Sequence, residues 1–127
     1  AELEKVIQDR VALVGLTKDL DAPITNLSYG EQKLFDLARA LINPHTFLLL
    51  DEPVAGLNPV LREKLKLVLS NLKERGETIL LIEHDLDFVR SVADQIIVLD
   101  QGRVLAEGQP EKVLQDARVL TAYLGAA

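Results

Sequence analysis

The sequence predicts an α/β fold, in which the strands of a mostly parallel sheet alternate with flanking helices. Two short apolar runs, Phe47–Leu50 and Thr78–Ile82, have the unbroken hydrophobicity of strands that are covered on both faces in parallel sheets. Segments with helical periodicity precede, separate and follow these runs, as expected for alternating strands and helices. With 48% apolar residues among 127, the chain can build a core, and its 4% aromatic content makes that core aliphatic.

The N-terminal third is predicted to be helical. Apolar residues recur at helical spacing over residues 2–16, and the Asp-Ala-Pro sequence at 21–23 breaks the pattern. Ser28 followed by Glu31 forms a capping box, in which the serine side chain accepts a backbone N–H and the glutamate reaches back. The helix that this box opens should end at the Asn-Pro pair at 43–44.

The elements after the first strand follow from caps, apolar runs and turn signals. Asn58 and Pro59 suit the N-cap and first position of a helix, and Gly76 suits its end. The expected elements are a helix to about Arg75, a strand at Thr78–Ile82, a short helix carrying Leu86, Val89 and Val92, a hairpin of Ile96–Leu99 and Arg103–Ala106, and helical segments at Pro110–Gln115 and Val119–Leu124.

Charge and cysteine content exclude several classes of protein. Fourteen Lys and Arg residues against twenty Asp and Glu give a net charge of −6, which argues against a binder of DNA or RNA phosphates. The chain has no cysteine, so disulfides and thiolate metal sites are excluded. We expect no nucleic-acid partner.

Two carboxylates, Asp51 and Glu52, directly follow the first apolar run. Ligands of open α/β sheets bind at the carboxyl ends of the strands. One carboxylate of such a pair can hold Mg²⁺, directly or through water, while its neighbour takes a proton from an attacking water. A solvated acidic turn is the alternative for a bare Asp-Glu pair, but the four preceding apolar residues and Pro53 favour a site.

Two histidines need separate interpretations. His84 follows the second strand, so it is expected at the same sheet edge as Asp51, where its imidazole can donate to a phosphate oxygen. Taken alone, a histidine there is more often structural or merely exposed. His45 lies in the turn after Pro44, and for this residue we retain the structural interpretation.

The sequence Ser28-Tyr29-Gly30-Glu31 opens a helix, and helix N-termini offer free N–H groups and a partial positive charge to a phosphate. Gly30 would let the phosphate approach the backbone closely. Glu31 does not exclude the phosphate if its carboxylate turns back toward Ser28. By itself, this motif is better explained as an ordinary helix cap.

The order and spacing of the motifs are more specific than any one of them. LSYGEQ, FLLLDEP, AGLNP and IEH, in this order over residues 27–84, resemble the signature, Walker B, D-loop and switch motifs of the ABC-type ATPase family. The ARAL stretch at 38–41 and the segment at 94–108 also look like that family. Tyr29 and Glu31 replace its usual glycine and glutamine, and these departures resemble the branch that imports branched-chain amino acids.

The resemblance implies part of a P-loop NTPase domain with a C-terminal hairpin. Residues 1–43 would be the remainder of its helical subdomain, and residues 44–127 part of its catalytic core. It further implies an ATP-hydrolysing subunit of an amino-acid importer, which pairs head to tail with a second ATPase subunit and works with transmembrane permease subunits. Such a subunit lies on the cytoplasmic face of the membrane as a peripheral protein.

Residue roles can be carried over by position. The resemblance implies that Asp51 helps to hold Mg²⁺, that Glu52 polarises the attacking water and that His84 contacts the γ-phosphate of ATP. The residues that would face a nucleotide held by another subunit are Ser28, Tyr29, Gly30 and Glu31 of the signature and Asn58 of the D-loop, where the family usually has aspartate.

One expected motif is absent. No glycine of the chain is followed by lysine, so the phosphate-binding sequence G-x-x-x-x-G-K-[ST] does not occur. The family's glutamine loop is also absent. We therefore expect a C-terminal part of one ATPase domain, which alone neither hydrolyses ATP nor binds it tightly. Its strands would lack their usual neighbour, so we expect that this piece either self-associates or is a proteolytic remnant of a longer protein.

Two other functions remain open from the sequence. One is an ABC ATPase of DNA repair or translation, against which the acidic charge argues. The other is a non-catalytic interaction module that acts only as a partner half-site. The joint presence of Asp51, Glu52 and His84 argues against that module, since it has no physical need for all three.

Overall fold

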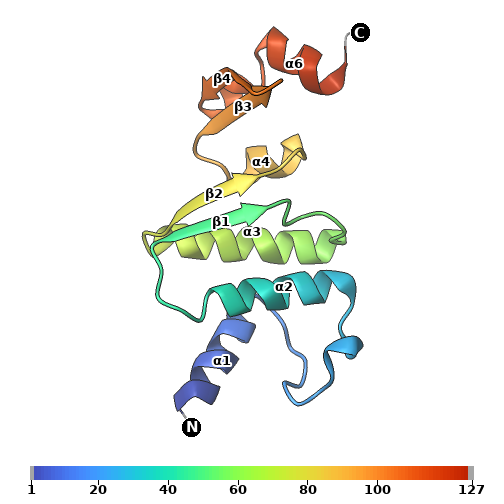
Figure 1. The fold of residues 1–127 in the computed structure, drawn as a ribbon, viewed down its shortest axis with the longest axis vertical. Coiled ribbons are helices and arrows are strands. Elements are labelled where there is room, and N and C mark those ends of the chain that lie inside the picture. Colours follow the sequence, from blue (N-terminus) through green and yellow to red (C-terminus); the bar gives the residue numbers. More distant parts are fainter. Residues whose placement is uncertain (1, 126–127) are drawn as a thin grey trace. The chain divides into compact units, whose positions relative to one another are not determined.

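The computed structural model describes residues 2–125 and divides after Ile82 into two compact units. The N-terminal unit contains α1 (Glu2–Leu13), a 3₁₀ turn (Ile24–Asn26), α2 (Tyr29–Ala40), β1 (Phe47–Asp51), α3 (Pro59–Glu74) and β2 (Thr78–Ile82) (Figure 1). The C-terminal unit contains α4 (Leu86–Val92), β3 (Ile96–Asp100), β4 (Arg103–Gly108), α5 (Pro110–Val113) and α6 (Ala117–Leu124). The alternation of helices and strands that the sequence predicts is confirmed.

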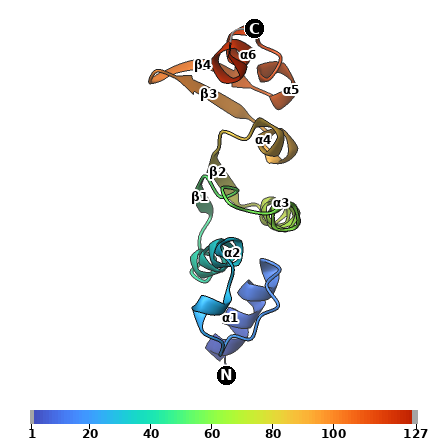
Figure 2. The ribbon, with the colours of Figure 1, turned by 90° about the vertical axis from the view of Figure 1, so that its right-hand side faces the viewer.

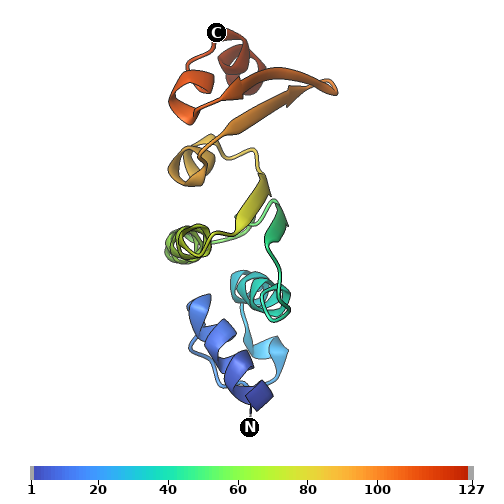
Figure 3. The ribbon, with the colours of Figure 1, turned by 90° about the vertical axis from the view of Figure 1, so that its left-hand side faces the viewer.

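The sheet of the N-terminal unit is a parallel pair, β1 and β2, connected through α3. The register runs from Phe47 opposite Thr78 to Asp51 opposite Ile82. Both strands were predicted as parallel-sheet strands from their apolar runs, and the prediction is confirmed. Figures 2 and 3 show α3 along one side of this sheet.

The opposite side of this sheet differs from the prediction of strands covered on both faces. Its apolar side chains are 47–58% exposed: Phe47, Leu49, Leu80 and Ile82. Side chains alternate between the two faces of a strand, so Leu48, which is buried, faces the other way. Within the described part of this unit, no element covers the exposed face.

Helix caps set the ends of two helices. Gly15 has φ of +74°, and the Gly15 and Leu16 N–H groups donate to the Ala12 and Val11 carbonyls. This is the Schellman arrangement, which a left-handed glycine makes favourable. It ends α1 at Leu13, earlier than the apolar pattern over 2–16 predicts. Gly76 ends α3 in the same way, as predicted.

The core of the N-terminal unit is aliphatic. Helix α2 contacts both α1 and α3, and each helix turns an apolar stripe toward its neighbours, as amphipathic helices do. The buried apolar side chains that these helices and their ends contribute are Val11, Val14 and Leu16 in and after α1, Leu34, Leu37, Ala38 and Leu41 in and after α2, and Leu61, Leu65, Val68, Leu69 and Leu72 of α3, to which Leu48, Val54 and Leu57 add from β1 and the loop after it.

The C-terminal unit is built around an antiparallel hairpin of β3 and β4. Gln101 and Gly102 at its turn have φ of +46° and +76°, as required at both central positions of the turns that suit twisted hairpins. Helices α5 and α6 pack against the hairpin, and the shared core consists of Ile96, Val98, Val113, Leu114 and Val119. The predicted hairpin is confirmed.

None of the helices in the described range 2–125 combines the length and apolar character needed to cross a membrane.

Candidate functional site

The first part of the site is the start of α2, where the predicted capping box is present. The Glu31 N–H donates to the Ser28 hydroxyl oxygen at 3.3 Å, and the Ser28 N–H donates to Glu31 Oε2 at 2.8 Å. The Glu31 carboxylate therefore folds back on Ser28, as the capping box predicts. This carboxylate therefore places a negative charge at the N-terminus of α2.

The charge of Glu31 is favoured by its surroundings. The Ser28 backbone N–H is the main cause that holds the pKa of the Glu31 carboxyl below its ordinary value, and the Ser28 hydroxyl adds to this effect. The Lys18 ammonium, 3.6 Å from Glu31 Oε1, contributes less.

The start of α2 packs on the loop at 55–58 and on the first turn of α3. A Cβ added to Gly30 would lie 2.6 Å from Leu61 Cδ1 and 3.2 Å from Leu57 Cδ2, so a glycine is needed for this close approach. The structure therefore gives Gly30 a packing role that the sequence analysis did not foresee. Its contact with a phosphate stays a prediction.

Tyr29 makes the second contact with this loop. Gly56 has φ of +75°, a conformation that glycine adopts readily, and the Tyr29 ring lies against it. Asn58 is the N-cap of α3, as predicted, and its Oδ1 accepts the Leu61 N–H at 2.9 Å. The part that the resemblance gives to Asn58 in nucleotide binding stays a prediction.

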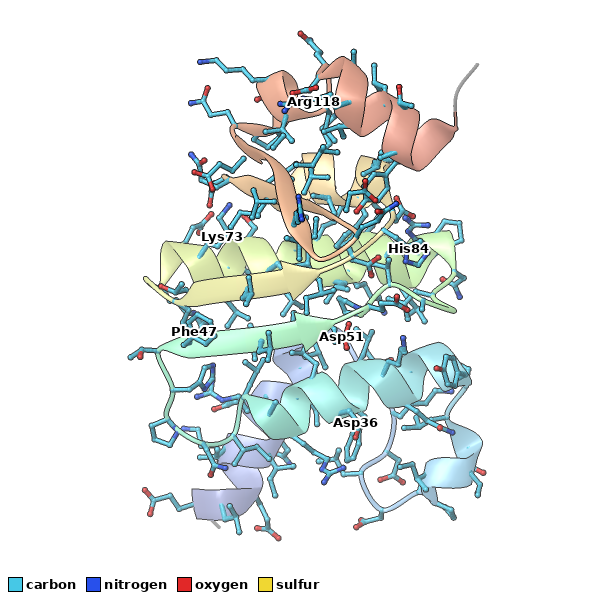
Figure 4. The ribbon with its side chains drawn as sticks, turned by 45° about the horizontal axis from the view of Figure 1, so that its top comes forward. Asp36, Phe47, Asp51, Lys73, His84 and Arg118 are labelled. Atoms are coloured by element: carbon cyan, nitrogen blue, oxygen red, sulfur yellow. The ribbon has the colours of Figure 1, made fainter. Side chains whose placement is uncertain are left out.

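Asp51 and Glu52 lie at the carboxyl end of β1, with Asp51 as the last residue of the strand (Figure 4). Both side chains are exposed. Glu52 has φ of +44°, in the left-handed region that non-glycine residues rarely enter. Its N–H donates to the Ile82 carbonyl at 2.9 Å, so the first residue after β1 is attached to the end of β2.

The Glu52 carbonyl is held from two directions. It accepts the Ala55 N–H at 3.3 Å and the Lys33 ammonium at 3.0 Å. Lys33 belongs to α2, so this bond joins the helix that begins at Tyr29 to the acidic pair. Lys33 and Asp51 also line the same cavity of about 250 Å³, whose other walls are largely apolar side chains of α2 and β1.

His84 is the candidate residue of the C-terminal unit, and it lies just before α4. The His84 side chain is 71% exposed, and its Nδ1 lies 4.0 Å from Oε2 of Glu83, whose side chain is fully buried. The same Glu83 oxygen accepts the His84 N–H at 3.2 Å. His84, Asp87, Arg90 and Tyr123 contribute to the lining of a cavity of about 350 Å³. Because His84 and Asp51 belong to different units, their expected sharing of one sheet edge stays a prediction.

His45 has the structural environment that we expected. Its Nδ1 lies 2.7 Å from the Asn43 carbonyl oxygen, and its Nε2 lies 2.8 Å from Glu77 Oε2. These contacts join the turn before β1 to the turn before β2.

The acidic residues do not form a metal cage of their own. Within residues 2–125, no group of three or more His, Cys, Asp or Glu side chains is arranged to hold a metal ion. Mg²⁺ is commonly bound by one or two carboxylates, water and substrate phosphates. The exposed Asp51 carboxylate therefore fits a Mg²⁺ ion that is held together with a nucleotide.

Two residues at these sites were not singled out from the sequence. Lys33 follows Tyr29 by four residues, which puts both on one side of α2, and this spacing was the available signal. Glu83 directly follows an apolar run of the sequence, as Asp51 does, but the sequence does not show that its carboxylate is buried.

Two family models match parts of the chain. A model described as ABC transporter matches residues 2–55, and a model described as branched-chain amino acid ATP-binding cassette transporter matches residues 103–127.

Curated relatives carry related names. The chain is 42% identical over 115 residues to the high-affinity branched-chain amino acid transport ATP-binding protein BraF of Pseudomonas aeruginosa, and 40% identical over 115 residues to LivG of Escherichia coli. Each alignment covers 90% of this chain and 45% of the relative, so the chain spans less than half the length of these relatives.

Solved structures agree in fold. An ATP-binding cassette of an ABC transporter in its ADP conformation superposes with a TM-score of 0.87 at 32% identity, covering 99% of this chain and 51% of the other. The cbiO1 protein of Clostridium perfringens, part of an ABC transporter complex, superposes with a TM-score of 0.79 at 33% identity, covering 94% of this chain and 49% of the other.

Proposed function

The chain belongs to the ABC-type ATPase family, and on that premise we propose that it supplies signature and hydrolysis residues to the shared ATP sites of an ATPase dimer in an amino-acid importer. The phosphate-binding G-x-x-x-x-G-K-[ST] sequence, which these 127 residues lack, must come from elsewhere in the assembly. A second ATPase subunit, paired head to tail, is the partner whose nucleotide the signature residues would face.

The residues act on ATP as follows. Glu52 accepts a proton from, or orients, the water that attacks the γ-phosphate. His84 donates to an oxygen of that phosphate. The N-terminus of α2, with Ser28 and Gly30, stabilises the negative charge of a nucleotide held by the second subunit, and Asn58 borders the same interface. Tyr29 and Glu31 form part of the surface at the N-terminus of this helix.

Asp51 is the residue that would hold Mg²⁺. Bound with the nucleotide, this ion neutralises charge on the phosphate oxygens. The chain itself contributes the Asp51 carboxylate at the end of β1, next to Glu52, which acts on the attacking water.

The observation that carries the proposal is the direct connection between the signature helix and the acidic pair. Tyr29 packs on Gly56, and Lys33 donates to the Glu52 carbonyl, so both motifs belong to one packed unit. An ordinary helix cap and an ordinary acidic turn would need no such connection.

The relatives named above are ATP-binding proteins of branched-chain amino acid transport, and the match of residues 103–127 to a family model of the same transporters points the same way. We therefore propose branched-chain amino acids as cargo, transmembrane permease subunits as partners, and a peripheral position on the cytoplasmic face of the membrane. A role in DNA repair or translation, or as a non-catalytic module, is not favoured by these relatives.

The test is a substitution in the natural protein that carries these residues, assembled with its partners. Glu52→Gln should lower steady-state ATP turnover by about 100-fold or more, because general-base catalysis typically contributes that much, while ATP affinity is retained. Glu63→Gln, which removes an exposed carboxylate of α3, is the matched control and should leave turnover unchanged. Equal turnover in Glu52→Gln and the unsubstituted protein would refute the role of Glu52.

A second measurement addresses the sharing of the site. The purified 127-residue chain should not hydrolyse ATP, and its dissociation constant should be about 1 mM or weaker, which corresponds to roughly −4 kcal/mol or less. Turnover of ATP by this chain as a lone subunit would overturn the proposal of a shared site.

A further inference from the structure

We propose that Lys33 is a positioning residue for the carboxylate of Glu52, an inference that rests on the proposed function. The Lys33 ammonium donates to the Glu52 backbone carbonyl at 3.0 Å. Lys33 lies on α2, and Glu52 follows β1, so the bond connects two elements that the sequence separates by a turn and a strand. Lys33 is half-buried, in keeping with an ammonium whose stem packs on the protein.

The conformation of Glu52 makes such a bond useful. A φ of +44° is rarely adopted by residues with a side chain, and strained residues persist only where the surrounding structure holds them. Backbone hydrogen bonds attach Glu52 to Ile82 and Ala55. Lys33 adds a side-chain donor to the carbonyl on the Ala55 side, where it opposes rotation of the peptide group.

Rotation of this peptide group would move the reacting carboxylate. The backbone dihedral angles of Glu52 set the direction of its Cα–Cβ bond, and therefore the direction in which its exposed side chain leaves the backbone. A displacement of about 1 Å at a reacting group can reduce the rate by about 100-fold. Lys33 therefore acts on hydrolysis through Glu52 and not through a contact with the nucleotide.

The ring of Tyr29 contacts the Lys33 ammonium on the same helix. The Lys33 ammonium lies 5.6 Å from the centroid of the Tyr29 ring, within the range of a cation–π interaction. The same ring packs on Gly56. The tyrosine that replaces the family's usual glycine thus connects the loop at Gly56, the ammonium of Lys33 and the backbone of Glu52.

The test compares Lys33→Met with Lys33→Arg in the natural protein that carries these residues, assembled with its partners. Lys33→Met keeps an unbranched side chain that is one atom shorter, and it removes the donor. It should lower kcat for ATP by about 10-fold or more, given the sensitivity of rates to small displacements. KM and ATP affinity should stay within about twofold, because the substitution affects the orientation of a reacting group and not the binding of the substrate. Lys33→Arg retains N–H donors and should restore most of the rate.

Two controls separate positioning from damage to the fold. Lys66→Met removes a partly exposed ammonium of α3, which pairs with Glu63, and should change neither kcat nor the melting temperature. Amide hydrogen exchange gives a readout independent of activity: the Ala55 N–H, which shares the Glu52 carbonyl with Lys33, should exchange faster in Lys33→Met.

The outcomes distinguish this inference from the proposed function. Unchanged kcat in Lys33→Met, in an assembly where Glu52→Gln abolishes turnover, overturns the role of Lys33 alone. Parallel losses of kcat, ATP affinity and melting temperature also overturn it, because they indicate general damage. If Glu52→Gln leaves turnover intact, the proposed function fails and this inference fails with it.

Discussion

The ring of Tyr29 lies directly on Gly56: a Cβ added to Gly56 would be 2.7 Å from Tyr29 Cε1 and 2.9 Å from Cδ1. This contact joins the first residue of α2 to the loop that leads into α3. Gly56 is constrained twice, because its φ of +75° disfavours any side chain and the tyrosine ring occupies the space where a Cβ would be.

The two constraints on Gly56 can be separated by substitution. Gly76 has φ of +85° and no atom within 4 Å of an added Cβ, so Gly76→Ala has the backbone strain alone, about 1–2 kcal/mol. Gly56→Ala should destabilise the chain more, since the Tyr29 ring must also move. Urea unfolding of both variants measures the difference in the free energy of unfolding.

A double-mutant cycle tests the assignment to Tyr29. In a Tyr29→Ala background, the excess destabilisation of Gly56→Ala over Gly76→Ala should disappear. If the excess persists without the ring, the tyrosine contact is not its cause.

The second prediction concerns the pKa of Glu31. Its pKa lies below the ordinary value of 4.5, mainly because of the Ser28 backbone N–H and next because of the Ser28 hydroxyl. Ser28→Ala removes the hydroxyl only, and should raise the pKa of Glu31 part of the way. Ser28→Pro removes the N–H as well, and should bring the pKa closest to 4.5. A ¹³C NMR titration of the carboxyl carbon measures the order.

Proline is compatible with this position. Ser28 has φ of −62°, and the preceding Leu27 has φ of −88° and ψ of 136°, both suited to a proline at 28. Asp116, whose pKa Arg118 lowers to about 2, serves as the internal control and should not change. An equal pKa of Glu31 in both variants would show that the backbone N–H is not the main cause.

The sign of the pH dependence follows from the lowered pKa. Glu31 binds protons more weakly in the folded chain, so its contribution to stability is present above its unfolded pKa, near 4.5. That contribution is lost as the pH falls through the lower, folded pKa. Ser28→Pro should therefore reduce the acid sensitivity of unfolding in this window.

Local rules predicted the parts of the site that depend on residues three or four positions apart. The Ser28–Glu31 capping box and the Asn58 N-cap are of this kind, and both are present. Glu52 escaped such rules because a left-handed conformation is expected of glycine or asparagine and not of glutamate. The Lys33–Glu52 bond joins distant positions through tertiary packing, which spacing along one helix cannot reveal.

The same limit explains the two interpretations of Gly30. From sequence, a glycine at a helix N-terminus suggested close approach of a phosphate. The structure shows that Leu57 and Leu61 already fill the space beside its Cα. The packing requirement arises from a different helix, so no local pattern contains it.

The third prediction is that the purified 127-residue chain self-associates through the exposed face of β1 and β2. That face carries Phe47, Leu49, Leu80 and Ile82, all about half exposed, and among the described residues each strand is paired on one edge only. Contiguous apolar surface and unpaired strand edges favour association. Leu49→Lys with Leu80→Lys should shift the chain toward monomer in light scattering. Leu67→Lys, at an exposed leucine of α3, is the control and should leave the association unchanged. If the unsubstituted chain is a monodisperse monomer that melts cooperatively, the prediction is contradicted.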